Sequence, residues 1–103
     1  MKYGLSEKQL TEIISFIHQN SEVQKAVLFG SRACGTYKVA SDIDIALMGD
    51  KVTSSLAAKM KFTIEEDSSL PYFIDFIAYP SITNEDLKEH ILTRGIVIYS
   101  RDE

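Results

Sequence analysis

The chain has 103 residues, of which 45% are hydrophobic and 25% charged, and its 15 acidic and 11 basic residues give a net charge of -4. This length predicts one compact soluble domain over residues 1–103 with a single core. The acidic balance argues against bulk nucleic-acid binding, and the single cysteine excludes an internal disulfide framework. No apolar stretch approaches the ~20 residues of a membrane span, and no signal-peptide pattern opens the chain, so we expect a cytoplasmic protein with no membrane partner.

Two hydrophobic periods alternate along the chain and predict helices and strands. Residues 6–20 have the pattern of an amphipathic helix, which Ser6 and Gln9 can open with a capping box. The segment 31–41 is small and polar, typical of a loop with one helical turn. The other expected elements are strands over 26–29, 43–48, 72–79 and 96–99, a helix over 52–65, and a helix over 84–94 capped by Thr83, with Leu87, Ile91 and Leu92 facing inward. This order predicts an α+β (α/β) fold with a small mixed β-sheet covered by helices.

Three carboxylates stand in or beside the expected strands. Asp42 and Asp44 are two residues apart, so on a strand they share a face. Asp75 interrupts an otherwise apolar strand, where a lone ionised carboxylate would be costly. If neighbouring strands bring the three together, they repel one another, and a divalent cation such as Mg²⁺ relieves that repulsion. Asp42, Asp44 and Asp75 are therefore the predicted metal ligands.

Each carboxylate also has a simpler explanation. An Asp-x-Asp beside a loop is often a solvated turn, and Asp75 alone could be a charge that protects a sheet edge from aggregation. The metal interpretation is favoured because a second feature accompanies the aspartates.

That second feature is a possible phosphate loop at the end of the first strand. Gly30 allows close backbone approach to a ligand, and Ser31 offers a hydroxyl to a phosphate oxygen. Arg32 could contact a phosphate or tie the loop down by pairing with a carboxylate. Lys38 is a further possible phosphate contact, although a solvated lysine explains it as well.

The spacing of these residues resembles a known signature. Gly30-Ser31, ten intervening residues and then Asp42-Ile43-Asp44 resemble the motif of the DNA-polymerase-β-like nucleotidyltransferases. The sequence around this motif, from Leu28 to Ala33 and from Ser41 to Ala46, is similar to that of the minimal nucleotidyltransferases. Asp75 matches the third carboxylate of the family.

The resemblance implies a polymerase-β-like fold and transfer of a nucleoside monophosphate, AMP from ATP, to an acceptor hydroxyl. Gly30 and Ser31 would bind the β- and γ-phosphates, with Arg32, Lys38 and Ser41 as further nucleotide-binding residues. Asp42 and Asp44 would hold two Mg²⁺ ions, and Asp75 would bind the second ion and help to deprotonate the acceptor.

The resemblance also implies a protein partner. Minimal nucleotidyltransferases are commonly paired with HEPN-domain proteins, and several adenylylate a tyrosine of the HEPN toxin as antitoxins. We expect that role here, because the chain shows no acceptor domain.

Two departures from the family pattern keep a second hypothesis open. Cys34 stands where the family often has a basic residue, and Ala40 where it often has glycine. A module with a weak or vestigial site that neutralises or scaffolds a HEPN partner by contact is therefore the alternative.

Overall fold

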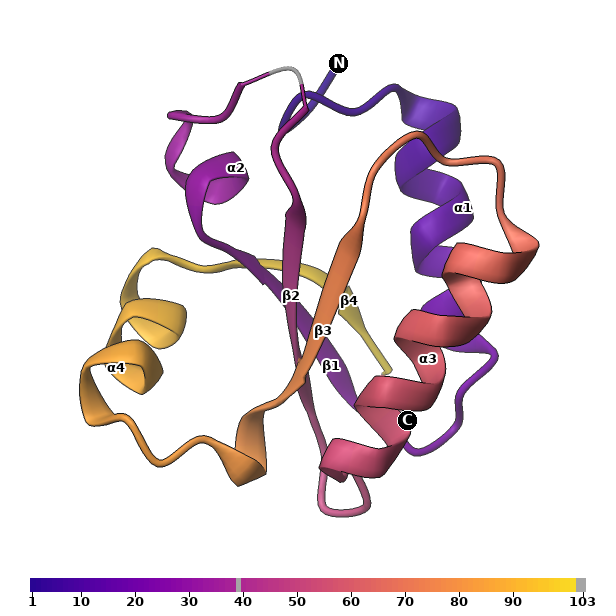
Figure 1. Cartoon of the computed structure of the whole chain (residues 1–103). Coiled ribbons are helices and arrows are strands. Elements are labelled where there is room, and N and C mark those ends of the chain that lie inside the picture. The colour runs from indigo at the N-terminus through magenta and orange to yellow at the C-terminus, as the bar shows by residue number, and fades with distance from the viewer. Residues whose placement is uncertain (39, 102–103) are drawn as a thin grey trace.

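The computed structural model describes residues 1–38 and 40–101, and it contains one mixed four-stranded sheet (Figure 1). The strands are β1 (Lys25–Phe29), β2 (Ile43–Met48), β3 (Ile74–Ala78) and β4 (Ile96–Ser100). Their order in the sheet is β3-β2-β1-β4. β3 runs parallel to β2, whereas β1 is antiparallel to both of its neighbours. The expected mixed sheet of an α+β fold is confirmed.

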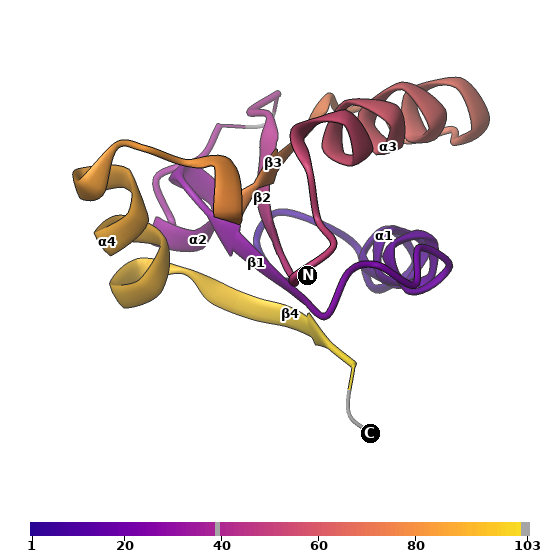
Figure 2. The same cartoon turned by 90° about the horizontal axis from the view of Figure 1, so that it is seen from below.

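Helices cover both faces of the sheet. They are α1 (Glu7–His18), α2 (Ser31–Cys34), α3 (Ser54–Asp67) and α4 (Glu85–Arg94), with a 3₁₀ turn η1 (Tyr79–Ser81) after β3. Figures 1 and 2 show α1 and α3 side by side on one face and α4 on the other. Two apolar clusters correspond to these faces, a large one that includes residues of α1 and α3 and a small one that includes residues of α4. No helix in the described part of the chain is both long and apolar enough to cross a membrane.

Strand alternation decides which face carries the aspartates. The odd-numbered residues of β2 all join the core under α1 and α3, while Ala46 joins the cluster under α4. Successive side chains of a strand point to opposite faces, so Asp44 lies on the α4 face. The same alternation on β3 places Asp75 on that face, together with Ile77.

The helix starts agree with the sequence at α1 and differ at α4. Ser6 caps α1 through the expected capping box with Gln9. The prediction that Thr83 caps the last helix is wrong, because the side chain of Asn84 accepts the hydrogen bond from the Leu87 N–H at 3.1 Å.

The inward face of α4 is also narrower than predicted. Ile91 is buried against the sheet, but Leu92 is 64% exposed. Neighbouring helical residues differ by about 100° in direction, so the two cannot both face the sheet.

Candidate active site

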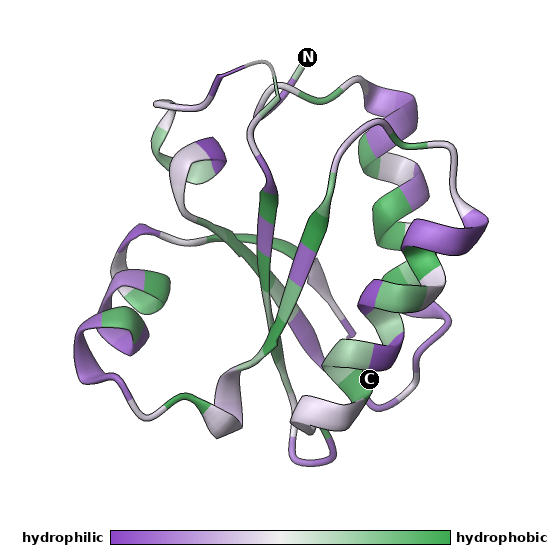
Figure 3. Ribbon diagram, in the orientation of Figure 1, coloured by the Kyte–Doolittle hydropathy of each residue, from purple (hydrophilic) through white to green (hydrophobic). Residues whose placement is uncertain are grey.

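The strand register brings together segments that are distant in the sequence. Asp44 of β2 is the direct partner of Asp75 of β3 in the parallel pair. Adjacent strands lie about 4.8 Å apart, so the two side chains are neighbours on the same face. Figure 3 shows the two hydrophilic bands side by side on otherwise hydrophobic strands. On the other side of β2, Asp44 is the partner of Phe29, which directly precedes Gly30.

The three aspartates influence one another electrostatically. Asp42 is exposed just before β2, whereas Asp44 and Asp75 are partly buried. Burial raises the pKa of the Asp44 carboxyl above its usual value, and the charges of Asp75 and Asp42 raise it further. The structure therefore brings the three predicted residues into one electrostatic neighbourhood, in which a bound cation would relieve repulsion.

The donor chemistry of this neighbourhood suits Mg²⁺, which prefers carboxylate oxygens and keeps several waters. However, the side chains of residues 1–38 and 40–101 do not form a ready-made group of three or more His, Cys, Asp or Glu that could hold an ion. Asp44 and Asp75 could share an ion after rotation of their side chains, with Asp42 joining from the start of the strand. The metal role of the three aspartates stays a prediction.

Lys61 is a neighbour of the site that the sequence analysis missed. Its Nζ lies 3.0 Å from Oδ1 of Asp75 and 2.8 Å from Oε2 of Glu65. The hydrogen bond that Lys61 donates to Glu65 raises the pKa of Lys61 most, the contact with Asp75 raises it further, and burial partly offsets this rise. The 61/65 spacing on a predicted helix indicates the first pair, but only the packing of α3 on β3 reveals the second.

The pairing changes the environment expected for Asp75. The sequence suggests a lone carboxylate in an apolar strand, whose charge only a metal would compensate. In the structure, the Asp75 side chain is 44% exposed and already has a cationic partner. β3 is an edge strand, so its polar residue reaches solvent and the end of the Lys61 side chain.

Gly30 brings the loop close to Asp44. Its φ of 79° lies in the left-handed region, which favours glycine. A Cβ at this position would lie 2.5 Å from Oδ2 of Asp44, so a larger residue would displace the carboxylate. Ser31 begins α2 directly afterwards, which confirms the helical turn expected in this segment.

Arg32 lies in the interior. It is 2% exposed, and its guanidinium donates to the carbonyl oxygen of Ser41 through Nε and Nη2 and to that of Tyr3 through Nη1. The rings of Tyr37 and Tyr72 lie 5.3 and 4.6 Å from its Cζ. This geometry favours the loop-anchoring role over direct contact with a phosphate, with backbone carbonyls as partners in place of the expected carboxylate.

Ser41 and Lys38 lie together in the same loop. The Ser41 hydroxyl accepts a hydrogen bond from the Lys38 backbone N–H at 2.7 Å, so it closes the turn that leads to Asp42. The Lys38 side chain is exposed. Their roles in nucleotide binding, like those of Gly30 and Ser31, stay predictions. Cys34, the last residue of α2, is exposed as a free thiol.

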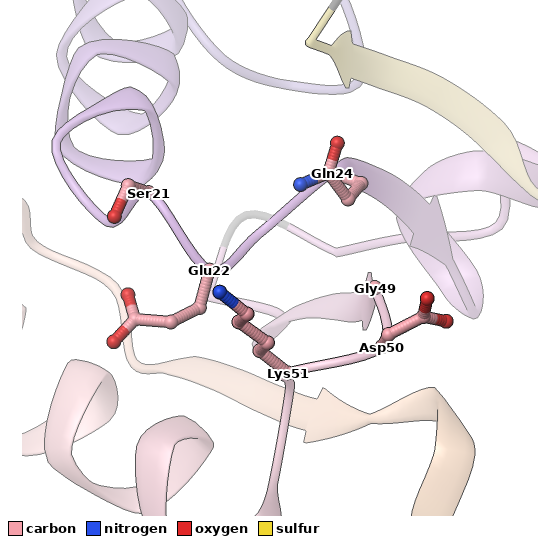
Figure 4. Close-up of a pocket in the computed structure, with 6 residues that line it drawn as sticks. All are labelled: Ser21, Glu22, Gln24, Gly49, Asp50 and Lys51. Atoms are coloured by element: carbon pink, nitrogen blue, oxygen red, sulfur yellow. The ribbon is translucent and has the colours of Figure 1, made fainter.

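Two surface hollows lie at opposite ends of the sheet. A hollow of about 710 Å³ lies where Lys25 pairs with Met48, far along the strands from the Phe29–Asp44 pair (Figure 4). It is lined by Ser21, Glu22, Gln24, Gly49, Asp50 and Lys51. A second hollow of about 480 Å³ lies along the loop and is lined by Met1, Gly4, Arg32, Tyr37, Lys38 and Tyr72. We locate the candidate site by the register of the aspartates, because the larger hollow contains none of the predicted residues.

Comparison with known proteins identifies the family of the chain. The family model of polymerase beta nucleotidyltransferases matches residues 11–103. The probable protein adenylyltransferase MntA of Haemophilus influenzae is 31% identical over 75 residues, which cover 73% of this chain. The match spans 65% of that relative, just under two thirds of its length.

Solved structures share the fold. A toxin-antitoxin crystallised with AMP-PNP has a TM-score of 0.75 and 23% identity, covering 90% of this chain and 74% of the other. The complex of tri-AMPylated Shewanella oneidensis HEPN toxin with MNT antitoxin gives a TM-score of 0.67 and 20% identity, covering 89% and 70%. The family match over residues 11–103 shows that the chain belongs to the polymerase beta nucleotidyltransferase family.

Proposed function

We propose that the chain is a protein adenylyltransferase that moves AMP from ATP to a tyrosine hydroxyl of a HEPN-domain toxin and thereby acts as its antitoxin. The observation that carries the proposal is the register pairing of Asp44 with Asp75 beside the Gly30 loop. The similarity to a probable protein adenylyltransferase supports the reaction. The fold shared with the antitoxin bound to an AMPylated HEPN toxin supports the partner.

The proposed site residues have separate roles toward the nucleotide and toward the acceptor. Gly30 and Ser31 would bind the β- and γ-phosphates, and Asp42 and Asp44 would hold Mg²⁺ together with Asp75. When bound, Mg²⁺ neutralises charge on the phosphates and on the attacking and leaving oxygens. The Asp75 carboxylate would accept the proton of the tyrosine hydroxyl.

The proposed transfer exchanges one bond for another at the α-phosphorus. The tyrosine oxygen bonds to this phosphorus while the bond to the oxygen bridging toward the β-phosphate breaks, and pyrophosphate leaves. Positioning of the acceptor in line with that bond supplies much of the rate. The partner protein would provide this positioning when it docks beside the loop and β3.

The experiment uses ATP labelled at either the α- or the γ-phosphorus, with Mg²⁺ and a HEPN-domain protein as the candidate partner. The proposal predicts that the partner takes up label from the α-phosphorus only. Label from the γ-phosphorus would indicate a kinase instead.

Absence of both labels would favour neutralisation by contact alone. Two observations favour that alternative. Lys61 pairs with Asp75, and Cys34 provides a thiol where the family often has a basic residue.

A further inference from the structure

Lys61 links helix α3 to the edge strand that carries Asp75, and Figure 1 shows these two elements next to each other. Its ammonium lies 3.0 Å from Oδ1 of Asp75, 2.8 Å from Oε2 of Glu65 and 3.4 Å from the carbonyl oxygen of Ile74. An ammonium has three N–H donors, so these oxygens can satisfy all of them. The lysine is therefore held at a defined place beside the candidate metal ligands.

A divalent cation at Asp75 would compete with this lysine. Oδ1 of Asp75 already accepts a hydrogen bond from a positive group, and a cation on either carboxylate oxygen would lie within a few ångströms of that group. Like charges at such a separation repel strongly where solvent is partly excluded. Cation binding thus favours the departure of Lys61.

Glu65 is an alternative ion-pair partner for Lys61. It lies one helical turn further along α3, and its contact with Lys61 is the shorter of the two ion pairs. The lysine can release Asp75 while it keeps a carboxylate partner, so its displacement costs less than the loss of a whole ion pair.

We propose that Lys61 is a positioning residue that neutralises Asp75 in the metal-free protein and moves onto Glu65 alone when a divalent cation binds at Asp44 and Asp75. The inference rests on the proposed function, because it takes these aspartates as metal ligands. The inference adds that Lys61 exchanges Asp75 for Glu65 as its partner, a change that the proposed function does not itself require.

The exchange predicts opposite effects for the two members of the Lys61–Glu65 pair. Lys61→Met removes the competing charge and should tighten cation binding. Glu65→Gln removes the alternative partner, so Lys61 stays on Asp75 and cation binding should weaken. Lys59→Met and Glu66→Gln change the charge of the same helix equally at exposed positions and serve as matched controls.

The test is a titration of the full chain with Mn²⁺, in which electron paramagnetic resonance measures the free ion. We expect the Kd for Mn²⁺ to fall about three- to tenfold in Lys61→Met and to rise about two- to fivefold in Glu65→Gln, with both controls within about twofold of the wild type. Lys61→Arg retains the charge and should bind Mn²⁺ like the wild type.

Two results would overturn the inference, and they differ in what else they affect. If Asp44→Asn abolishes Mn²⁺ binding but Lys61→Met and Glu65→Gln match their controls, the exchange of partners is wrong and the metal site stands. If Asp44→Asn binds Mn²⁺ as the wild type does, the proposed metal site is wrong as well. Melting curves of each variant without metal verify that the protein measured is folded.

Discussion

The guanidinium of Arg32 donates two hydrogen bonds to the carbonyl oxygen of Ser41, at 3.2 Å from Nε and 2.8 Å from Nη2. A third bond from the same group, to Tyr3, holds the turn at the beginning of the chain. Arg32 directly follows the Gly30-Ser31 pair, and Ser41 directly precedes Asp42. One buried side chain therefore ties the Gly30-Ser31 segment to the backbone that precedes Asp42.

Replacing this arginine tests its anchoring role. Arg32→Met leaves the carbonyl oxygens of Tyr3 and Ser41 without the guanidinium that donates to them and removes a buried side chain, so the free energy of unfolding should fall by about 2–4 kcal/mol in urea denaturation. Lys38→Met, at an exposed lysine of the same loop, should change it by less than about 0.5 kcal/mol. Equal stability of the two variants would refute the anchoring role of Arg32.

Gly30 and Gly35 allow a paired test of the close approach to Asp44. Both have a φ of 79°, but ψ is 10° at Gly35 and -154° at Gly30. Alanine adopts the left-handed conformation of Gly35 at a cost of about 1 kcal/mol, whereas the conformation of Gly30 is essentially restricted to glycine. A Cβ meets nothing within 4 Å at Gly35 but would lie 2.5 Å from the Asp44 carboxylate at Gly30. Gly30→Ala should therefore weaken ATP binding at least about tenfold in calorimetry, because it displaces Asp44.

In the same titrations, Gly35→Ala should bind ATP with an affinity near that of the wild type. Similar affinities for the two alanine variants would show that the Gly30–Asp44 contact has no part in binding the nucleotide.

Burial of the Asp44 carboxyl and its repulsion by Asp75 and Asp42 predict opposite effects of this charge on stability and on cation binding. Its raised pKa means that the ionised carboxyl is less favourable in the folded than in the unfolded chain, so near neutral pH it destabilises the fold. Asp44→Asn removes this charge and should raise the melting temperature of the metal-free protein by about 2–6 °C. Mg²⁺ with ATP should raise the melting temperature of the wild type but not that of the variant.

Asp50→Asn is the control for the charge change, since Asp50 is exposed beyond the end of β2. It should retain the response to Mg²⁺ and ATP. A full response in Asp44→Asn would argue against Asp44 as a ligand.

Local patterns in the sequence were sufficient for most of the fold. β2 begins and ends at the residues that its apolar run indicates, and Ser6 with Gln9 predicts the start of α1. At α4, both Thr83 and Asn84 can cap a helix, and the sequence does not show which of them reaches the free N–H groups. The prediction that Leu92 faces inward was wrong, because Ile91 occupies the buried position of this helical turn.

The candidate site was predictable only where spacing along one strand determines geometry. The two-residue spacing of Asp42 and Asp44 predicts that they lie close together, although β2 itself begins only at Ile43, and the motif indicates Gly30 and Ser31. The contacts of Arg32 with Tyr3 and Tyr72 and of Lys61 with Asp75 join segments that are further apart in the sequence, and no local pattern encodes such contacts. Arg32 in particular resembles a solvent-exposed phosphate contact until the structure shows it buried between two tyrosines.

Intact-mass spectrometry of the HEPN partner, after incubation with this chain, ATP and Mg²⁺, tests the proposed function most directly. The account predicts that the partner gains one or more AMP groups on tyrosine. Asp42→Asn and Asp44→Asn should each abolish the added mass while the two proteins still bind. A partner that stays unmodified, yet is neutralised by the wild-type chain, would contradict the account and establish neutralisation by contact.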